Sequence, residues 1–387
     1  MKKKYIMTAA AILMGGVLPM LAQEQAEEFT VATLNVDGLP SKLLGITINS
    51  DGPGEKYTPE IANYLLQQDY DLVGLQENFN FHDYLFPILE ENYQHDECYG
   101  KIAMEYLAYP LPFDGINLLW RNGIEGERTD SVAWKDAYGI INHSNDQLTR
   151  KGFRRYDLTL TDGSQVVVYN GHWDASDDYD EAKGWDGKDR EARQKQWIQL
   201  RDTIMNQLDK RPVIVMGDMN SYYCRDSVKH YFIDHIEATG KATVGDAWIE
   251  LEHGGEYPDM VEGPVTRDEG RRGWVRQGEM LDKILYINPT GGGKLTPLSY
   301  DVDSVAYVRS DAPEMALGDH FPVAVKFRYE PADDTTTGIS DAAVPTHSIP
   351  QAAYGDAWYN LSGRKLNAKP TTPGVYLHRG QKTIIGS

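Results

Sequence analysis

Cysteine is almost absent from this sequence, whose 387 residues include only Cys98 and Cys224. The spacing of these two thiols offers no zinc motif. In an exported protein the two could form one disulfide, but they could equally be two separate buried thiols. The sequence leaves both alternatives open.

Positive charge is also scarce. Lys and Arg number 38 against 58 Asp and Glu, which gives a formal net charge of −20. Proteins that bind nucleic acid by neutralising its phosphates carry a basic footprint, whereas here the arginines are scattered except at Arg150–Arg155 and Arg267–Arg276. Nucleic acid is therefore the less favoured partner, although a divalent cation can supply local positive charge to a nuclease. With 41% hydrophobic residues the chain can bury a core, so wholesale disorder is excluded.

The extended apolar stretch of the chain lies at its N-terminus. Lys2, Lys3 and Lys4 precede the apolar run Ile6–Leu21, which ends in Ala22 and Gln23. A transmembrane anchor needs about 20 strongly apolar residues, and this run is shorter and rich in Thr, Ala and Gly. We therefore predict a cleaved signal peptide at residues 1–23 and a secreted, periplasmic or cell-surface location. Cleavage removes three lysines and no acid, so the charge changes from −20 to −23.

The composition changes again near Pro331. Residues 329–350 are polar and unpatterned and are predicted to form a linker. Residues 351–387 carry an N-L-x-G element and a P-G-x-Y element, and we expect strands around Trp358–Arg364, Gly374–Leu377 and Thr383–Ile385. This tail resembles the C-terminal sorting-type segments of some secreted bacterial proteins. A small accessory hairpin without a sorting role is the alternative.

Between these ends, residues 29–328 are predicted to be one catalytic domain of the α/β class. Short apolar runs of the kind found in buried sheets are expected to be strands: Phe29–Leu34, Asp71–Leu75, Gly115–Trp120, Gln165–Tyr169, Val213–Met216, Leu285–Ile287 and Phe321–Phe327. Helices are predicted at Pro59–Gln68, with Thr58 as N-cap, and at Asp189–Leu208, where Trp197, Leu200 and Ile204 share one face. Strands and helices alternate loosely, which indicates a layered arrangement with polar side chains gathered at one rim.

Most of the predicted strands end in Asn, Asp, Glu or His. A single such residue is usually a turn or cap residue, but six or seven such endings are hard to explain as turns. Carboxylate and amide oxygens suit a hard cation such as Mg²⁺, which keeps several waters and binds through few carboxylates plus substrate phosphate. The pattern therefore predicts a magnesium-dependent site for a phosphoester.

These endings belong to six short blocks that occur in order along the chain: Asn35–Leu39, Leu75–Glu77, Gly171–Ala175, Gly217–Asn220, Leu281–Ile284 and Gly318–Val323. They resemble the signature blocks of the endonuclease/exonuclease/phosphatase superfamily, and the resemblance spans Phe29–Phe327. It implies a four-layer α/β sandwich of two packed mixed β-sheets flanked by helices. It also implies hydrolysis of a phosphoester by metal-assisted in-line attack of water.

The resemblance also implies roles for individual residues. One or two Mg²⁺ ions, which Mn²⁺ can replace, would be bound by Glu77 as the main ligand, with Asn35, Asp37 and Asp319 nearby. Asp218 would be the general base toward water, and Asn220 would orient water and phosphate. His320 would contact a phosphate oxygen while Asp282 accepts its other N–H, and His172 would be a second imidazole facing the phosphate.

The substrate is predicted from weaker features. The segment Asn145–Phe153 before the His172 block is similar to the bacterial sphingomyelinase branch, where Lys151 would contact phosphate; its alternative is an exposed loop charge. Asp174, assigned here to substrate binding, departs from that branch, which carries an amide or other polar residue there. Trp185 and Trp274 are candidates for contact with a membrane surface.

We expect a secreted phosphodiesterase that cleaves a phospholipid head group. An extracellular endonuclease or an inositol or small-molecule phosphatase of the same fold is the alternative, and a catalytically idle binding module is a third, which the full residue set disfavours. No protein partner is implied.

Overall fold

A computed structural model describes residues 27–43, 46–47, 49–98, 114–139, 151–175, 187–260, 275–276, 279–332, 358–359, 365–366, 368–371, 374–378 and 381–385. The chain divides into two compact units, Met1–Asp333 and Asp334–Ser387, and each is described by itself. The predicted signal peptide lies outside the described residues, and its assignment, like those of the linker and the sorting-type tail, stays a prediction.

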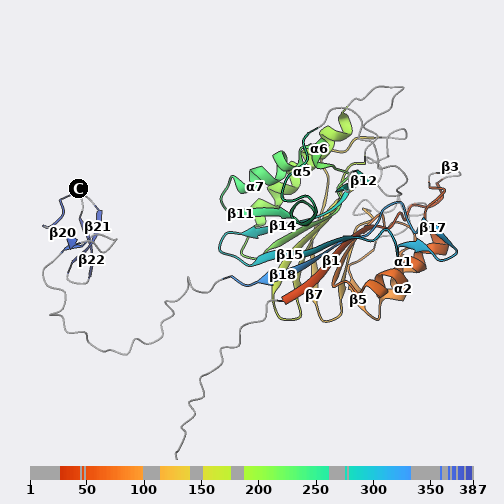
Figure 1. The fold of residues 1–387 in the computed structure, drawn as a ribbon, viewed down its shortest axis with the longest axis horizontal. Coiled ribbons are helices and arrows are strands. Elements are labelled where there is room, and N and C mark those ends of the chain that lie inside the picture. Colours follow the sequence, from red (N-terminus) through yellow and green to blue (C-terminus); the bar gives the residue numbers. More distant parts are fainter. Residues whose placement is uncertain are drawn as a thin grey trace, which may run out of the picture. The chain divides into compact units, whose positions relative to one another are not determined.

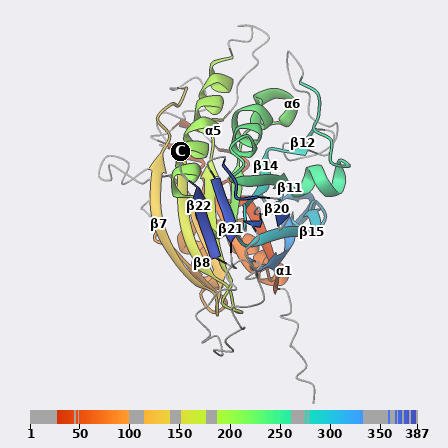
Figure 2. The same cartoon turned by 90° about the vertical axis from the view of Figure 1, so that its left-hand side faces the viewer.

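Two six-stranded sheets form the centre of the first unit (Figure 1). In spatial order, the first sheet contains β15 (Lys294–Val302), β18 (Val323–Glu330), β1 (Glu27–Asn35), β4 (Leu72–Gln76), β6 (Asn117–Arg121) and β5 (Tyr93–His95). The second contains β11 (Ala242–Asp246), β14 (Asp282–Pro289), β10 (Val213–Asp218), β9 (Gln165–His172), β8 (Gly152–Thr159) and β7 (Glu125–Ala133). Both sheets are mixed, because β1 pairs with β4 and β9 with β10 in parallel while their other pairs are antiparallel. The long strands β7 and β8 run side by side at one edge (Figure 2).

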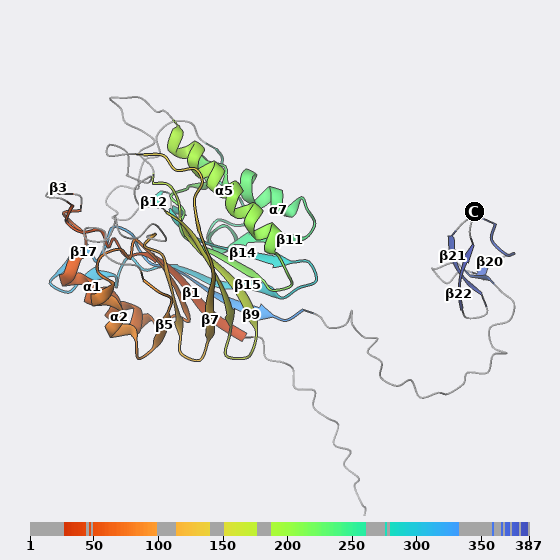
Figure 3. The same cartoon turned by 180° about the vertical axis from the view of Figure 1, so that it is seen from behind.

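Helices cover the outer face of each sheet, as the view from behind shows (Figure 3). On the side of the first sheet lie α1 (Gly54–Gln68) and α2 (His82–Leu89), and on the side of the second lie α5 (Lys188–Gln207), α6 (Tyr223–Asp226) and α7 (His235–Glu237). Two π-helical stretches, η1 (Lys229–Asp234) and η2 (Trp248–Glu252), belong to the same region as α6 and α7. The order helix, sheet, sheet, helix confirms the predicted four-layer α/β sandwich.

The alternation of side chains along the strands explains the layers. In β9, Val166 and Val168 belong to the core shared with the first sheet, while Val167 and Tyr169 pack in the core on the α5 side. Successive side chains of a strand point to opposite faces, so a continuous apolar run serves two buried faces at once. The predicted strands are therefore confirmed by a sheet that is covered on both sides.

The predicted helices need one correction. Helix α5 is confirmed, and Trp197, Leu200 and Ile204 are each at most 1% exposed against the second sheet. Thr58, however, is not an N-cap: α1 begins at Gly54 after Pro53, and the Thr58 hydroxyl donates to the Gly54 carbonyl one turn earlier, at 2.6 Å. The Thr-Pro pair predicts a helix start at Pro59, but Pro59 lies in the second turn of a helix that begins at Gly54.

Short paired strands complete the described part of the first unit: β2 (Lys42–Leu43) with β3 (Ile46–Thr47), β12 (Val275–Arg276) with β13 (Glu279–Met280), and β16 (Val308–Arg309) with β17 (Ala312–Ala316). The second unit contains a four-stranded sheet of β20 (Lys365–Leu366), β19 (Trp358–Tyr359), β21 (Gly374–His378) and β22 (Gln381–Ile385). No disulfide joins the two described cysteines Cys98 and Cys224, which resolves the alternatives left open above. None of the described helices is long and apolar enough to span a membrane.

Candidate active site at the rim of the two sheets

The topology brings the predicted site residues to one rim. Asn35, Gln76, His172 and Asp218 end strands β1, β4, β9 and β10, which run in parallel within each sheet. Asp282 begins β14, which is antiparallel to β10 and pairs Asp282 with Asp218. The carboxyl ends of parallel strands and the amino end of an antiparallel neighbour meet at the same edge, which is the usual ligand site of open α/β sheets.

A glycine pair lets β9 and β10 approach closely at this edge. Gly217 pairs with Gly171, and a Cβ on Gly217 would overlap the carbonyl oxygen of Gly171. Gly217 also has a φ of 143°, which other residues rarely adopt. The next residues along each strand, His172 and Asp218, are consequently held side by side.

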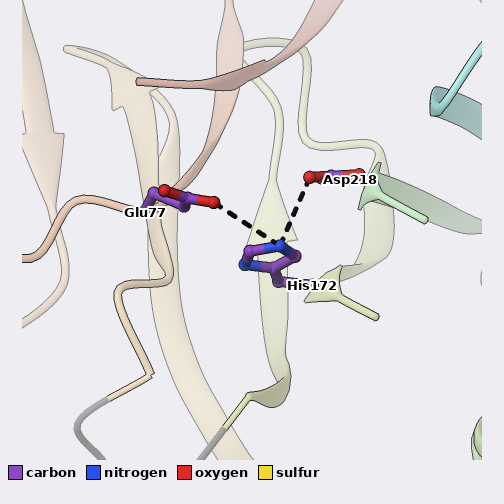
Figure 4. A group of neighbouring side chains, drawn as sticks. All are labelled: Glu77, His172 and Asp218. Carbon is purple, nitrogen blue, oxygen red and sulfur yellow. Dashed lines mark ion pairs between the residues drawn. The ribbon is translucent and has the colours of Figure 1, made fainter. Parts of the chain in front are cut away.

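Glu77, His172 and Asp218 form a compact polar group, in which His172 contacts both carboxylates (Figure 4). Asp218 Oδ2 lies 3.3 Å from His172 Nε2, and Asn35 Nδ2 donates to the same oxygen at 3.0 Å. Asn35 Nδ2 also donates to Glu77 Oε1 at 3.1 Å, and that oxygen lies 3.9 Å from His172 Nε2. Residues at the ends of β1, β4, β9 and β10 are therefore connected by contacts of 3.9 Å or less.

His320 lies on the other side of Asp218. Its Nδ1 is 2.7 Å from Asp282 Oδ2, and its Nε2 is 3.7 Å from Asp218 Oδ2 and 4.0 Å from Asp319 Oδ1. The Asp282 contact fixes the ring, so that Nε2 is the nitrogen directed to the site. The structure thus places the His320–Asp282 pair as the sequence analysis predicted.

Three of these residues have a left-handed backbone. Asp37, Glu77 and Asn220 have φ angles of 50°, 54° and 45°. Such conformations are sparsely populated for residues other than glycine and cluster at functional sites. Gly38 supports two of them, because its amide donates to the Glu77 carbonyl oxygen at 3.1 Å and any Cβ there would overlap that oxygen.

Asn220 is fixed from two directions. Its amide donates to Asp218 Oδ1 at 3.0 Å, and its side-chain Nδ2 donates to the Trp173 carbonyl at 3.2 Å. The Asp218–Asn220 pair therefore forms a rigid turn directly after β10, in which the asparagine fixes the neighbouring carboxylate.

Carboxylates crowd one side of the site. Burial raises the pKa of Asp37 to about 8, and the charges of Asp319 and Glu77 act in the same direction. The hydrogen bond from Asn49 Nδ2 to Asp37 Oδ1, at 2.5 Å, and the charge of His320 oppose this rise in the pKa of Asp37 but do not cancel it. A cation among these oxygens would offset their mutual repulsion.

The two histidines differ in charge. Burial, followed by the charge of Lys151, holds the pKa of His172 below its usual value. Burial would likewise lower the pKa of His320, but Asp282, Asp218 and Asp319 outweigh it and raise that pKa well above the usual value. The site therefore offers one neutral and one positively charged imidazole.

The two carboxylates between them also differ. Burial alone would raise the pKa of Asp218, but the charge of His320, together with the close contact with His172, outweighs it and holds the pKa below its usual range. Burial raises the pKa of Asp282 to about 6 against the opposing charge of His320. Asp218 is thus the more firmly ionised of the two.

The donor set fits a hard divalent cation. Ligand atoms of Glu77, His172 and Asp218 lie within 4.8 Å of one another, as do those of Asp218, Asp282 and His320. Within the described part of the chain, both ring nitrogens of His172 and Oδ1 of Asp282 lack hydrogen-bond partners. Buried polar atoms without partners are rare and need an explanation, and a bound cation with its waters and a phosphate supplies one.

The two predicted substrate-binding residues have different surroundings. Lys151 is only 7% exposed, and its Nζ donates to the Trp173 carbonyl at 3.3 Å, so it is not an exposed loop charge. Asp174 is fully buried, and its Oδ2 accepts from the Tyr138 amide at 2.7 Å. Oδ2 of Asp174 is thus engaged with the Tyr138 backbone, and its role in substrate binding stays a prediction. Residues 145–150, Trp185 and Trp274 lie outside the described residues.

A buried amide network under the rim was missed by sequence reasoning. Gln76 Nε2 donates to Asn170 Oδ1 at 2.7 Å, and Asn170 Nδ2 donates to the Leu75 and Asn117 carbonyls at 3.1 and 2.8 Å. Asn78 Nδ2 donates to Asn117 Oδ1 at 3.0 Å. Gln76 and Asn170 each directly follow a predicted strand; an amide at a fully buried position of each sheet is the signal that they pair across the interface.

A hollow of about 400 Å³ opens beside Asp37. It is lined by residues of the loops after β1 and β4 and by the start of α1, among them Lys42, Asn49, Glu55, Asn80, Phe81 and Tyr84. Asn49 links the hollow to the site through its hydrogen bond with Asp37. The hollow has the size of a small-molecule subsite.

Comparisons with known proteins agree with this architecture. The sequence profile of the Endonuclease/Exonuclease/phosphatase family matches residues 32–286. A TDP2 of D. rerio humanised by 14 mutations is 15% identical, with 78% of this chain and 98% of that chain covered and a TM-score of 0.50. A truncated Caenorhabditis elegans TDP2 is 16% identical with the same coverage and TM-score.

A third similar structure is an endonuclease/exonuclease/phosphatase family protein from Bacteroides thetaiotaomicron, 16% identical, covering 79% of this chain and 96% of that chain at a TM-score of 0.49. At these identities the structural likeness shows the fold alone. No curated protein sequence matches the chain.

Proposed function

The chain belongs to the endonuclease/exonuclease/phosphatase family, whose members are metal-dependent hydrolases of phosphoester bonds, and from its rim site we propose that it is a Mg²⁺-dependent phosphodiesterase. The observation that carries the proposal is the convergence of Glu77, His172, Asp218 and His320 from different strands on one small space. Asn35 joins the acidic and imidazole sides through its two hydrogen bonds.

Glu77, Asn35, Asp37 and Asp319 are the residues that would hold the cation. When bound, it would act as a Lewis acid that stabilises negative charge on the phosphate. His320, held in its charged form, donates from Nε2 to a non-bridging phosphate oxygen, and Asp282 keeps the ring in the orientation that allows this. These residues therefore stabilise the negative charge that develops on the phosphate oxygens in the transition state.

Asp218 orients the attacking water. Because its pKa lies below the usual range, its carboxylate is ionised and accepts a hydrogen bond from water throughout the working pH range. A low pKa also makes it a weak proton acceptor, so its main contribution is to hold the water in line with the scissile bond. Asn220 fixes the Asp218 carboxylate for this task.

We propose a phospholipid head group as the substrate. The net charge of −20 supports this choice, because a chain so acidic has little with which to hold a polyanion. The hollow beside Asp37 is large enough for the group attached to the phosphate, and its lining is mostly uncharged, with Lys42 and Glu55 as its charged residues. Secretion, which the N-terminal sequence favours, would bring the enzyme to extracellular membranes.

Single-stranded DNA is the second candidate. A D. rerio TDP2 that shares the fold, at 15% identity and a TM-score of 0.50, was crystallised with a single-strand DNA product. The rim site of the present chain is equally compatible with a nucleotide phosphodiester, so only the group beyond the phosphate distinguishes the two substrates.

A substrate panel tests the proposal. Sphingomyelin vesicles, a single-stranded oligonucleotide, plasmid DNA, inositol phosphates and bis-p-nitrophenyl phosphate are each incubated with Mg²⁺ and with EDTA. We expect release of phosphocholine that EDTA abolishes, and slower or no cleavage of DNA. Efficient DNA cleavage without lipid turnover would replace the lipid by the second candidate.

Two variants test the site itself. His320→Gln should lower turnover by about 10²- to 10⁴-fold, the usual contribution of such a group, and Glu77→Gln should raise the Mg²⁺ requirement. His230→Gln is the matched control, since His230 is exposed on η1 and remote from the rim strands. Equal turnover of wild type and His320→Gln on every substrate would show that the assigned mechanism is wrong.

A further inference from the structure

Tyr307 is a fully buried tyrosine in the turn before β16. It is 0% exposed, and its ring packs edge-on against the ring of Tyr64, with centroids 5.1 Å apart and planes at 76°. Among the described residues its hydroxyl has no hydrogen-bond partner. Buried tyrosine hydroxyls usually find a partner, because leaving one unmade is costly.

The hydroxyl faces the acidic side of the rim. Its oxygen lies 3.5 Å from the point where a Cβ on Gly318 would stand, and Cβ of Asp37 lies 3.5 Å from the same point. The charges that raise the pKa of Tyr307 after burial are those of Asp37, Asp319 and Asp282, in that order. The absent side chain of Gly318 thus leaves a gap between the Tyr307 hydroxyl and the Cβ of Asp37.

The backbone around Tyr307 holds this orientation. The Leu317 amide donates to the Tyr307 carbonyl at 3.3 Å. In the adjoining strand pair, Arg309 Nε donates to the Ala316 carbonyl at 3.0 Å and Arg309 Nη2 to the Asp51 carbonyl at 2.5 Å. The turn is therefore tied both to β17 and to the loop before α1, and the ring is held against Tyr64.

We propose that Tyr307 is a positioning residue for the metal site, whose hydroxyl donates a hydrogen bond to the hydrated cation's water, or to a carboxylate oxygen that binds it, on the Asp37 side. The inference rests on the proposed function, since it requires a divalent cation at the rim. Mg²⁺ retains several of its waters when bound to proteins, and the gap beside Gly318 gives such a water access to the hydroxyl. Tyr307 would then restrain the Asp37 side of the site without touching substrate.

Tyr307→Phe removes only the hydroxyl and tests the inference. Partners of metal ligands typically contribute 10- to 100-fold to metal affinity, so we expect about tenfold weaker binding of Mg²⁺ in a calorimetric titration with MgCl₂. The melting temperature of the metal-free variant should equal or exceed that of wild type, because the lost hydroxyl had no partner there. Turnover should return toward the wild-type rate at saturating Mg²⁺.

Tyr93→Phe is the matched control. Tyr93 is also buried, but its hydroxyl donates to the Tyr70 carbonyl at 2.7 Å, away from the rim. This variant should melt at a lower temperature than wild type and bind Mg²⁺ with unchanged affinity. Gly318→Ala provides a second test, since its methyl group would occupy the gap and should weaken Mg²⁺ binding while Tyr307 is intact.

Each result separates the two proposals. Wild-type affinity for Mg²⁺ in Tyr307→Phe, or a metal-free melting temperature lowered as in Tyr93→Phe, would overturn the role of Tyr307 while leaving the proposed function standing. No Mg²⁺ binding and no metal-dependent turnover by the wild type would instead refute the proposed function.

Discussion

Arg154 joins the two sheets through a buried ion-pair cluster, and its removal gives a sharp test of what holds them in register. The residue projects from β8 and is 1% exposed. Its guanidinium donates to both Asp114 oxygens, at 2.9 and 2.6 Å, and to Asp96 Oδ2 at 2.5 Å. Tyr156 of the same strand donates to that Asp96 oxygen at 3.0 Å.

The free energy of unfolding that Arg154→Met should remove depends on the partners that Asp96 and Asp114 retain. Removing one partner of a buried ion pair typically destabilises a protein by about 3–5 kcal/mol, because the other charge stays buried without compensation. Asp96 retains Arg128 Nη1 at 3.5 Å, whereas Asp114 keeps only a backbone donor, the Ile116 amide at 3.1 Å, among its described hydrogen bonds. The carboxylate left without a charged partner should therefore be that of Asp114. At about 2–4 °C per kcal/mol of lost stability, the melting temperature should drop by roughly 6–20 °C.

Neighbouring Arg155 provides the control. It points to the other face of β8 and pairs at 3.0 Å with Asp157, which is 29% exposed. Because this pair is partly open to solvent, Arg155→Met should cost less than Arg154→Met, closer to the roughly 1 kcal/mol or less that is typical of exposed ion pairs. Urea denaturation of both variants measures the difference, and adding Asp114→Asn to Arg154→Met should recover part of the loss. If Arg154→Met costs no more than Arg155→Met, the buried cluster does not contribute as argued.

Three further outcomes are expected. Gly217→Ala should prevent folding or destabilise the protein by well over the roughly 1–3 kcal/mol of backbone strain alone, because the added Cβ overlaps a carbonyl oxygen. Gly163→Ala should cost only that strain, since Gly163 has a φ of 91° and no atom within 4 Å of the added Cβ. Similar stabilities of the two variants would contradict the close approach of β9 and β10. Cys98 and Cys224 should resist a thiol reagent in the native state and both react in guanidinium chloride, because burial raises the pKa of the Cys98 thiol and Cys224 is 1% exposed; rapid native labelling would refute this. Mg²⁺ at 100 times its dissociation constant should raise the free energy of unfolding by about 2.7 kcal/mol, and an unchanged denaturation midpoint on adding EDTA would argue against a resident cation.

The strands and the chemistry at their ends were predictable because both depend on local order in the sequence. A run such as Val213–Met216 followed by Asp218 predicts a buried strand that ends in a carboxylate, and β10 ends at Asp218. Helix α5 was predictable for the same reason, since Trp197 and Leu200 recur at helical spacing. The start of α1 was not, because a Thr-Pro pair fits both a first turn and a second turn, and the packing against the first sheet decides between them.

The parts of the site that the sequence did not reveal depend on contacts between distant segments. Tyr307 lies in a turn without a motif, and only the fold shows that its hydroxyl faces Asp37. The sequence predicts Lys151 to be either an exposed loop charge or a phosphate contact. Its burial against the Trp173 carbonyl results from the pairing of β8 with β9, which the sequence does not show. Such roles follow from the three-dimensional neighbours of a residue rather than from its type.

The buried amides link the position of the site residues to the packing of the two sheets. Asn117 makes two kinds of hydrogen bond: its Oδ1 accepts from Asn78, which directly follows the proposed metal ligand Glu77, and its Nδ2 donates to Asp96 Oδ1 at 3.2 Å. Asp96 in turn is held by Arg154 of the second sheet. The strained turn at Glu77 is thus supported by a chain of hydrogen bonds that crosses from one sheet to the other at the contact between Arg154 and Asp96, and this link forms only when the sheets are correctly registered. Because a half-satisfied buried network is costlier than an apolar core, the same contacts that fix the register of the sheets also fix the position of the Glu77 carboxylate.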